Sequence, residues 1–396
     1  MSSNVPANIP VRPKKEISLP HNIARDSPAL SAVNHAVPSI PGMVLARRHL
    51  AHFIRFASRV TVKSATPGLR GCLFGADSIA VTNLDVSLRT VLPGARDIGV
   101  LVPVDVLKRC IGGNDRSEIH IARDQSNPAR PFAVRIDGAL ISGHDPAEFP
   151  AVAALFPNGQ AVAHARFQTL EPVLVAASND DHDRSKAGIF FQLCRNVAVA
   201  TNSHVLHAVG IEGNGDGDFL VPRKAIDLVE IIRKATKTRE VTVAFHQDHA
   251  IFRIAQFELS ARLEKTQFPA WEEVVPKSSK YELRVSKTDL LRALDRVAAA
   301  ISDRARGVVL HRSGERLEIY GENPKAGELK TDIAASGWVD KAMIELNLSY
   351  LFNAARYAPS DDLRIGISDE TSPIKIDDGP YLALVMPIGP KKGTNS

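Results

Sequence analysis

The sequence predicts an α+β protein made of three repeated units, each with two helices packed on antiparallel sheets. Three observations support this prediction. The same order of helical and strand-like patterns occurs three times along the chain. Gly71, Gly188 and Gly307 each open a strand pair, at a period of roughly 120 residues that is too long for the common solenoids. Phe149–Pro150 and Phe268–Pro269 close the first two units in the same way.

The first unit follows residues 1–42, where prolines recur without hydrophobic periodicity and a disordered tail with a small basic spot is expected. After Met43, apolar residues fall at helical spacing on one face, and three arginines share another face. Glycines after residue 111 suit the end of a second helix. The elements predicted here are a helix reaching about residue 60, strands at 71–88, a helix at 103–112, and strands at 118–122 and 132–136.

The second and third units repeat this order. In the second, we expect a helix at about 165–177, a strand pair at 188–206, a helix after Pro222, and strands at 241–245 and 250–254. In the third, we expect a helix at 287–301, strands at 307–310 and 316–320, a helix at 348–357, and strands at 363–367, 374–376 and 382–386.

The last strand, within Leu382–Ile388, is apolar and is stopped by a proline. An isolated strand is not stable, so it must complete a sheet formed by earlier residues. Its final apolar side chains must then lie near a surface. This strand is either an ordinary buried strand or one wall of a groove that receives a partner's apolar peptide.

The composition is that of a globular protein with several domains. The 396 residues are 44% hydrophobic and 23% charged, with a net charge of +5. This mild excess of positive charge is compatible with a polyanionic partner but does not require one. The three cysteines are far apart and form no C-x-x-C pair, which fits a reducing cytoplasm better than a disulfide framework. No stretch predicts a membrane span or a signal peptide.

Sequences that could bind metals are better explained as loops. Glu212–Asp218 lacks the glycine and final glutamate of a calcium loop at their required places. His246 and His249 lack further ligands at zinc spacing, and residues 179–183 read as an exposed loop. We therefore expect no metal and no cofactor.

Five short motifs carry more specific information. They are Ala200–Leu206 (Ala-Thr-Asn-Ser-His-Val-Leu), Phe268–Pro276, Arg306–Val308, Asn347–Leu351 and Val385–Ile388. They occur in the order and at the spacing of the bacterial sliding clamp, the beta subunit of DNA polymerase III, and the chain resembles that family over about residues 43–388.

The resemblance implies three clamp-type domains per chain and a head-to-tail homodimer that closes into a ring around duplex DNA. It implies clamp domains at residues 43–160, 161–276 and 277–389, followed by a short tail at 390–396. It also implies a tether rather than an enzyme, with double-stranded DNA, DNA polymerase and clamp-loader subunits as partners. Two other hypotheses remain open: a clamp-fold paralogue that binds partner peptides without encircling DNA, and an unrelated enzyme with a coincidental repeat.

Two sets of site residues follow from the resemblance and the helical patterns. The groove for partner peptides is expected to involve Thr201, His204, Leu206, Pro269, Val274, Asn347, Tyr350, Leu384, Val385, Met386, Pro387 and Ile388. Non-specific contacts to DNA phosphates are expected from Arg48, Arg55, Arg59, Lys108, Arg109, Lys224, Lys234, Arg292, Arg296 and Arg356.

The chain departs from the family pattern at several groove positions. Lys186 stands where a leucine is usual, and Ser203 replaces a glycine. Glu272 and Glu273 replace residues that are commonly basic, and Gly389 replaces a basic residue. These departures indicate a divergent clamp, such as a second copy that serves a particular polymerase, and they leave the peptide motif of the partner open.

Overall fold

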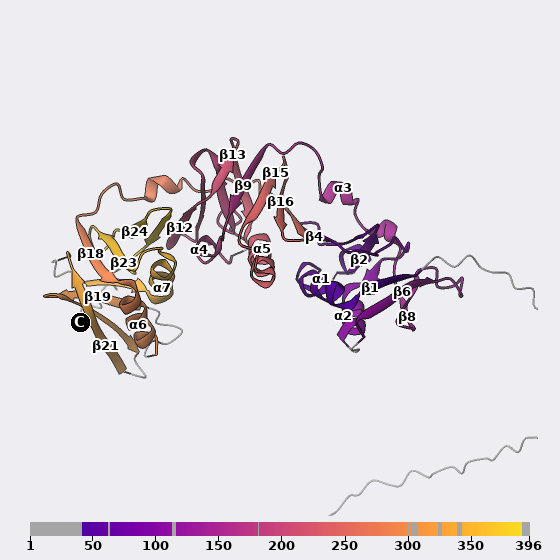
Figure 1. Cartoon of the computed structure of the whole chain (residues 1–396). Coiled ribbons are helices and arrows are strands. Elements are labelled where there is room, and N and C mark those ends of the chain that lie inside the picture. Colours follow the sequence, from indigo (N-terminus) through magenta and orange to yellow (C-terminus); the bar gives the residue numbers. More distant parts are fainter. Residues whose placement is uncertain are drawn as a thin grey trace, which may run out of the picture. The chain divides into compact units, whose positions relative to one another are not determined.

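The computed structural model of the protein describes residues 42–61, 64–112, 116–180, 182–299, 301, 307–323, 327–338 and 343–389. Within these residues the chain forms three antiparallel sheets with helices packed against them (Figure 1). Most of the predicted N-terminal tail, the tail at 390–396 and Arg306 lie outside the described residues.

Five of the six predicted helices form where the sequence predicts them, and the one expected at 165–177 does not. The α-helices are α1 (Arg47–Val60), α2 (Val104–Gly112), α3 (Val152–Leu155), α4 (Glu171–Leu174), α5 (Arg223–Thr236), α6 (Lys287–Ala298) and α7 (Leu348–Tyr357). In α1 the buried face includes Leu50, Phe53 and Ala57, as the spacing of apolar residues predicts. Side-chain caps start two helices: Ser286 accepts a hydrogen bond from the backbone N–H of Asp289 in α6, and Asn347 accepts one from Tyr350 in α7.

Two of the sheets involve the first half of the chain. A four-stranded sheet has the order β1 (Met43–Ala46), β6 (Glu118–Asp124), β7 (Ala133–Ile136) and β8 (Ala139–Ser142). A nine-stranded sheet has the order β13 (Glu212–Asn214), β9 (Ala163–Phe167), β15 (Val241–Phe245), β16 (His249–Ile254), β17 (Phe257–Arg262), β4 (Val86–Val91), β3 (Ser78–Thr82), β2 (Gly71–Gly75) and β5 (Val102–Pro103). The pairing of β4 with β17 joins the first predicted unit to the second.

The third sheet joins the second predicted unit to the last. Its order is β14 (Asp218–Pro222), β10 (Gly188–Gln192), β11 (Val197–Thr201), β12 (Val205–Gly210), β25 (Tyr381–Val385), β24 (Ile374–Asp378), β23 (Asp362–Ile367), β18 (Tyr281–Ser286), β21 (Gly327–Ser336), β20 (Arg316–Asn323), β19 (Gly307–Ser313) and β22 (Met343–Asn347). The predicted last strand is confirmed as β25, and it pairs with β12 rather than ending at a free edge.

The recurring glycines are explained by close packing at the start of a strand. A Cβ on Gly71 would lie 2.3 Å from Cγ of Leu101, and one on Gly188 would lie 2.7 Å from the carbonyl oxygen of Val221. A larger residue at either position would therefore push against the neighbouring segment.

Two sequence-based assignments are wrong in detail. The helix predicted at 165–177 is instead strand β9 followed by the single turn α4. Residues 163–167 alternate buried and exposed, a period of two that places Ala165 and Phe167 inside. The strand pairs at 71–88 and 188–206 are each three strands, because a turn after Thr82 and after Thr201 sends the chain back once more.

Candidate functional site

A largely apolar cavity of about 300 Å³ lies beside the pairing of β12 with β25. In this pairing Leu206 is opposite Leu384, and Val205 is opposite Val385. The cavity is lined by Lys186, Thr201, Ser203, His204, Val205, Leu206, Pro269, Ala270, Trp271, Val274, Pro373, Leu384 and Met386. Segments far apart in the sequence therefore meet at one concave surface, as the sequence motifs predict.

A tight turn between β11 and β12 shapes one side of the cavity. The side chain of Asn202 accepts hydrogen bonds from the backbone N–H groups of His204 and Val205, each at 3.0 Å. Thr201 Oγ1 accepts one from the N–H of Ser203 at 3.1 Å. Ser203 adopts a left-handed backbone with φ of 76°, a conformation that favours glycine. The turn is thus held by its own side chains.

The C-terminal motif is fastened directly to this turn. The N–H of Met386 donates a hydrogen bond of 2.9 Å to the carbonyl oxygen of His204. The side chains of Met386 and Val274 remain 38% and 56% exposed, although both are apolar. Leu206 and Leu384 form the buried floor, at 4% and 3% exposure. Exposed apolar side chains around a buried apolar floor suit the capture of an apolar ligand.

The linker at residues 268–276, which precedes β18, forms another part of the cavity lining. The ring of Phe268 stacks on Phe190 with centroids 4.7 Å apart. Trp271, in the short 3₁₀ helix η4 (Trp271–Val274), donates from Nε1 to Oε1 of Gln192 at 3.3 Å. These contacts hold the linker on the face of the sheet that carries Leu206 and Leu384, and Val274 lines the cavity while it stays largely exposed.

Lys186 brings a positive charge to the cavity. Its Nζ donates to Ser203 Oγ at 2.8 Å and lies 2.8 Å from Asp183 Oδ2. The hydrogen bond from Lys186, together with one from Ser185, lowers the pKa of Asp183 below its usual value. Lys186 and Ser203, two of the departures from the family pattern, are therefore in contact with each other.

Five of the predicted groove residues do not line this cavity. Asn347 caps α7, and the Tyr350 hydroxyl accepts a hydrogen bond of 3.1 Å from Nδ2 of Asn202 behind the turn. Val385 is buried within the β12–β25 ladder. Pro387 pairs with Leu346, and the N–H of Ile388 donates to Glu345 at 2.7 Å. Pro387 and Ile388 thus hold the segment after β25 against β22, next to Met386.

Sequence reasoning missed several lining residues. Trp271 and Ala270 stand inside a quoted motif, so that motif could have indicated them. Val205 follows Thr201 and His204 on the same turn. Pro373 precedes β24 and carries no local signal that distinguishes it from a loop proline.

All ten predicted DNA-contacting side chains are exposed, and they lie on α1, α2, α5, α6 and α7. Some of them form local ion pairs. Arg109 lies 3.6 Å from Asp105, Arg292 lies 3.6 Å from Asp289, and Lys234 pairs with Glu171. Exposed pairs of this kind contribute little to stability and leave the cations accessible to phosphates.

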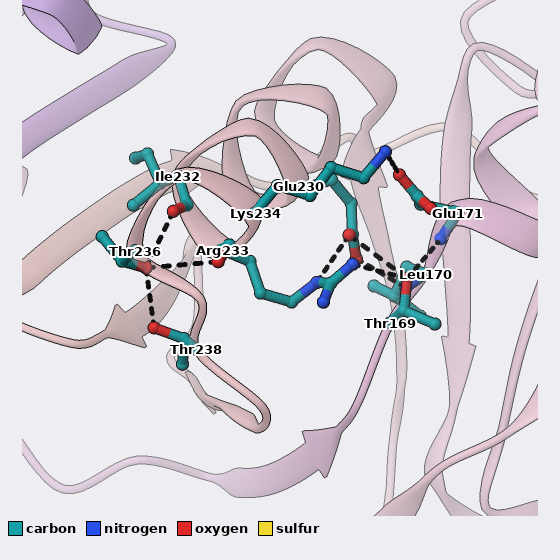
Figure 2. Close-up of polar contacts among 9 residues, drawn as sticks. All are labelled: Thr169, Leu170, Glu171, Glu230, Ile232, Arg233, Lys234, Thr236 and Thr238. Carbon is teal, nitrogen blue, oxygen red and sulfur yellow. Dashed lines mark hydrogen bonds and ion pairs between the residues drawn. The ribbon is translucent and has the colours of Figure 1, made fainter.

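Figure 2 shows how α5 is joined to the segment before α4. Glu230, only 2% exposed, accepts hydrogen bonds from the N–H of Leu170 at 2.6 Å and from Arg233 Nε at 2.7 Å. Arg233 also donates to Thr169 Oγ1 at 3.2 Å. The guanidinium of Arg233 therefore hydrogen-bonds within the protein, whereas Lys224 and Lys234 of the same helix are exposed.

Two searches of the described residues give negative findings. No three histidine, cysteine, aspartate or glutamate side chains come together there in a way that could hold a metal ion. Among the same residues, no helix has both the length and the apolar character needed to cross a bilayer.

Comparisons with known proteins find similar sequences and similar structures. A family model described as the C-terminal domain of the DNA polymerase III beta subunit matches residues 272–387. The beta sliding clamp of Pseudomonas putida is 26% identical over 211 residues, which are 50% of this chain and 57% of that protein. The Escherichia coli K12 clamp is 25% identical over 199 residues, 48% of this chain and 53% of that protein. The chain thus spans about half the length of the curated relatives it matches.

Solved structures match over a longer range. The beta subunit from Thermotoga maritima has a TM-score of 0.73 at 21% identity and covers 88% of this chain and 100% of its own. The sliding clamp from Bacillus subtilis has a TM-score of 0.76 at 16% identity, covering 88% of this chain and 99% of its own. The architecture is therefore the α+β clamp fold. The chain is a distant homologue of the bacterial beta sliding clamps, a non-catalytic family, which confirms the resemblance in its motifs.

Proposed function

We propose that the protein is a DNA sliding clamp that gives processivity to a DNA polymerase in the cytoplasm. In this proposal, residues 43–160, 161–276 and 277–389 are three clamp domains, and two chains assemble head to tail into a closed ring. A head-to-tail interface ends at a finite number of copies only if the rotation between neighbours closes. The ring would encircle duplex DNA and slide along it.

The observation that carries the proposal is the exposure of all ten predicted cations on helices whose other faces are buried. On α1, Arg48, Arg55 and Arg59 are exposed while Leu50, Phe53 and Ala57 are buried. Such helices offer positive charge without side chains arranged to read bases. Binding of this kind is independent of sequence and is weakened by salt, as movement along DNA requires.

The cavity beside β12 and β25 supplies the second part of the proposal. A short apolar peptide of a polymerase or clamp-loader subunit would bury its side chains against Leu206, Leu384 and Met386. Methionine adapts its shape to different ligands, which suits a site that serves several partners. A polymerase held in this way stays at high effective concentration near the DNA it copies.

Retention on DNA tests enclosure directly. The protein is loaded on nicked circular DNA with a clamp loader, and half of the sample is then cut once with a restriction enzyme. We expect long retention on the circle and rapid loss from the linear DNA. Equal retention on both would contradict topological linkage. A monomeric mass in solution, with peptide binding intact, would favour a clamp-fold protein that does not encircle DNA.

A further inference from the structure

The Lys186 ammonium is held in place at the rim of the cavity. Its side chain is 25% exposed, and its backbone N–H donates to the carbonyl oxygen of Asp183 at 3.1 Å. Of its three side-chain N–H groups, one is directed to Ser203 and one to Asp183. Within the described residues, the third has no protein partner.

The backbone at Ser203 shows what this arrangement costs. With φ of 76°, Ser203 occupies a region that glycine enters freely and other residues enter with strain. Glycine would relieve that strain, but it would remove the hydroxyl that accepts the Lys186 hydrogen bond. The serine therefore places the lysine at the cost of local backbone strain.

The fixed charge among the cavity-lining side chains is positive. Lys186 carries it, and none of the lining residues is an aspartate or glutamate. Asp183 pairs with Lys186 from outside the cavity, with 37% of its side chain exposed. A ligand that fills the cavity removes water from the third N–H of Lys186. Unless the ligand supplies an acceptor, that N–H is left unpaired, which lowers affinity.

We propose that Lys186 makes the cavity selective for a partner peptide that combines apolar residues with an aspartate or glutamate side chain. The peptide carboxylate would accept a hydrogen bond from the third N–H group of the Lys186 ammonium. The ammonium attracts a carboxylate through a full opposite charge but an amide oxygen only through a dipole, so a carboxylate is preferred over an amide in the same place. This inference rests on the proposed function of the cavity, and it adds the chemistry of the partner.

A peptide array tests the preference without a known partner. The probes are hexapeptides with two adjacent leucines, in which aspartate, asparagine or alanine occupies each remaining position in turn. For the full-length protein, we expect at least one position where aspartate binds about tenfold more tightly than asparagine. We also expect this ratio to fall as salt is raised.

Three variants make the test specific to Lys186. Lys186→Met keeps the length and apolar stem but removes the charge, and it should reduce the aspartate-to-asparagine ratio to about one. Ser203→Gly suits the backbone at that position and should lower the ratio while the protein stays folded. Arg184→Met, whose guanidinium lies 3.9 Å from Glu264 and does not line the cavity, should leave the ratio unchanged.

The outcomes separate this inference from the proposed function. Equal binding of aspartate and asparagine peptides by the unmodified protein would overturn the role of Lys186 while leaving an apolar groove. An aspartate preference that survives Lys186→Met would overturn it as well. If no leucine peptide binds at any position, both the inference and the groove assignment fail.

Discussion

The described part of the chain contains the same turn at two junctions between predicted units, where β4 pairs with β17 and where β12 pairs with β25, and the apolar cavity lies beside the second. Thr82-Asn-Leu-Asp-Val86 and Thr201-Asn-Ser-His-Val205 stand 119 positions apart and form the same turn. In both, the asparagine side chain accepts from two following N–H groups, and the third residue has positive φ. The strand beyond then donates a hydrogen bond back, from Arg262 to Asp85 and from Met386 to His204.

Each junction has its own linker, residues 149–156 for the first and 268–276 for the second. The two linkers differ in which apolar side chains they bury. Six positions after the phenylalanine of each linker stand Leu155 and Val274. Leu155 is 6% exposed and packs with Phe149 and Phe156, whereas Val274 is 56% exposed. The guanidinium of Arg89 covers the Phe156 ring at 4.4 Å from its centroid.

This difference teaches that the scaffold alone does not make the site. At the first junction, Leu155 and Phe156 of the linker are buried, and β17 ends in the charged Arg262. The second leaves Val274 and Met386 unpacked above an apolar floor. A few side chains on a repeated backbone therefore decide whether a junction packs its apolar residues or leaves them exposed.

The largest expected contrast comes from equivalent substitutions in the two linkers. Leu155→Ala should lower the free energy of unfolding by about 2–4 kcal/mol, because it leaves a cavity in a packed cluster. Val274→Ala should change it by less than about 0.5 kcal/mol, because the side chain is largely in water. Denaturant unfolding curves of both variants measure this contrast. Equal destabilisation would show that the second linker is also packed as core.

At the second junction, stability should depend on pH through a buried histidine. His207 is fully buried in β12, and its Nδ1 lies 2.5 Å from the carbonyl oxygen of Pro172. Burial lowers its pKa to about 4, against the opposing effect of that hydrogen bond. The Tyr381 hydroxyl from β25 lies 3.5 Å from the same nitrogen. The position 119 residues earlier is the buried Leu88, which does not titrate.

The sign follows from proton binding. The unfolded chain takes up a proton at His207 near pH 6.5, but the folded protein does so only near pH 4. Its contribution to stability is therefore complete above pH 6.5 and falls by up to about 3 kcal/mol as the pH drops toward 4. Thermal unfolding from pH 7 to 4 should show a smaller loss in His207→Leu than in the wild type. His204→Gln, exposed on the adjacent turn, should behave like the wild type.

A smaller effect should come from Arg89 at the first junction. Arg89 Nε donates to Glu258 across the β4–β17 pairing at 2.5 Å, with the two side chains 31% and 25% exposed. Partial exposure screens the pair, so Arg89→Met should cost about 1 kcal/mol in total, including the lost contact with Phe156. Arg253→Met removes the more exposed partner of Glu258 and should cost less. If the two costs are equal, the cover over Phe156 contributes nothing measurable.

The sequence predicted the long helices better than the short elements. The amphipathic patterns of α1, α5, α6 and α7 are strong because one face of each is buried for several turns. Residues 165–177 misled the prediction because small apolar residues surround Pro172, and the alternation at Ala163–Phe167 is too short to outweigh them. The sequence patterns did not predict β4 and β12, the third strands after the pairs β2–β3 and β10–β11, although the repeated Thr-Asn-x-x-Val turn marks where they begin.

For the site, the motifs located the cavity but not its details. Seven of the twelve predicted groove residues line it, including Leu206, Val274 and Met386. For Lys186, the sequence shows only a departure from the family pattern. Nothing local in the sequence predicts that its ammonium contacts the Ser203 hydroxyl, 17 residues away. Such contacts depend on tertiary packing.

Processive DNA synthesis by the cognate polymerase tests the account most directly. We compare the wild type with the double variant Val274→Asp, Met386→Asp, and with the control Val91→Asp, whose valine is 64% exposed at the first junction. All three proteins should fold, because the altered side chains are exposed. We expect the double variant to lose stimulation of product length on primed circular DNA, while the control retains it. Full stimulation by the double variant would contradict the claim that the open junction holds the partner.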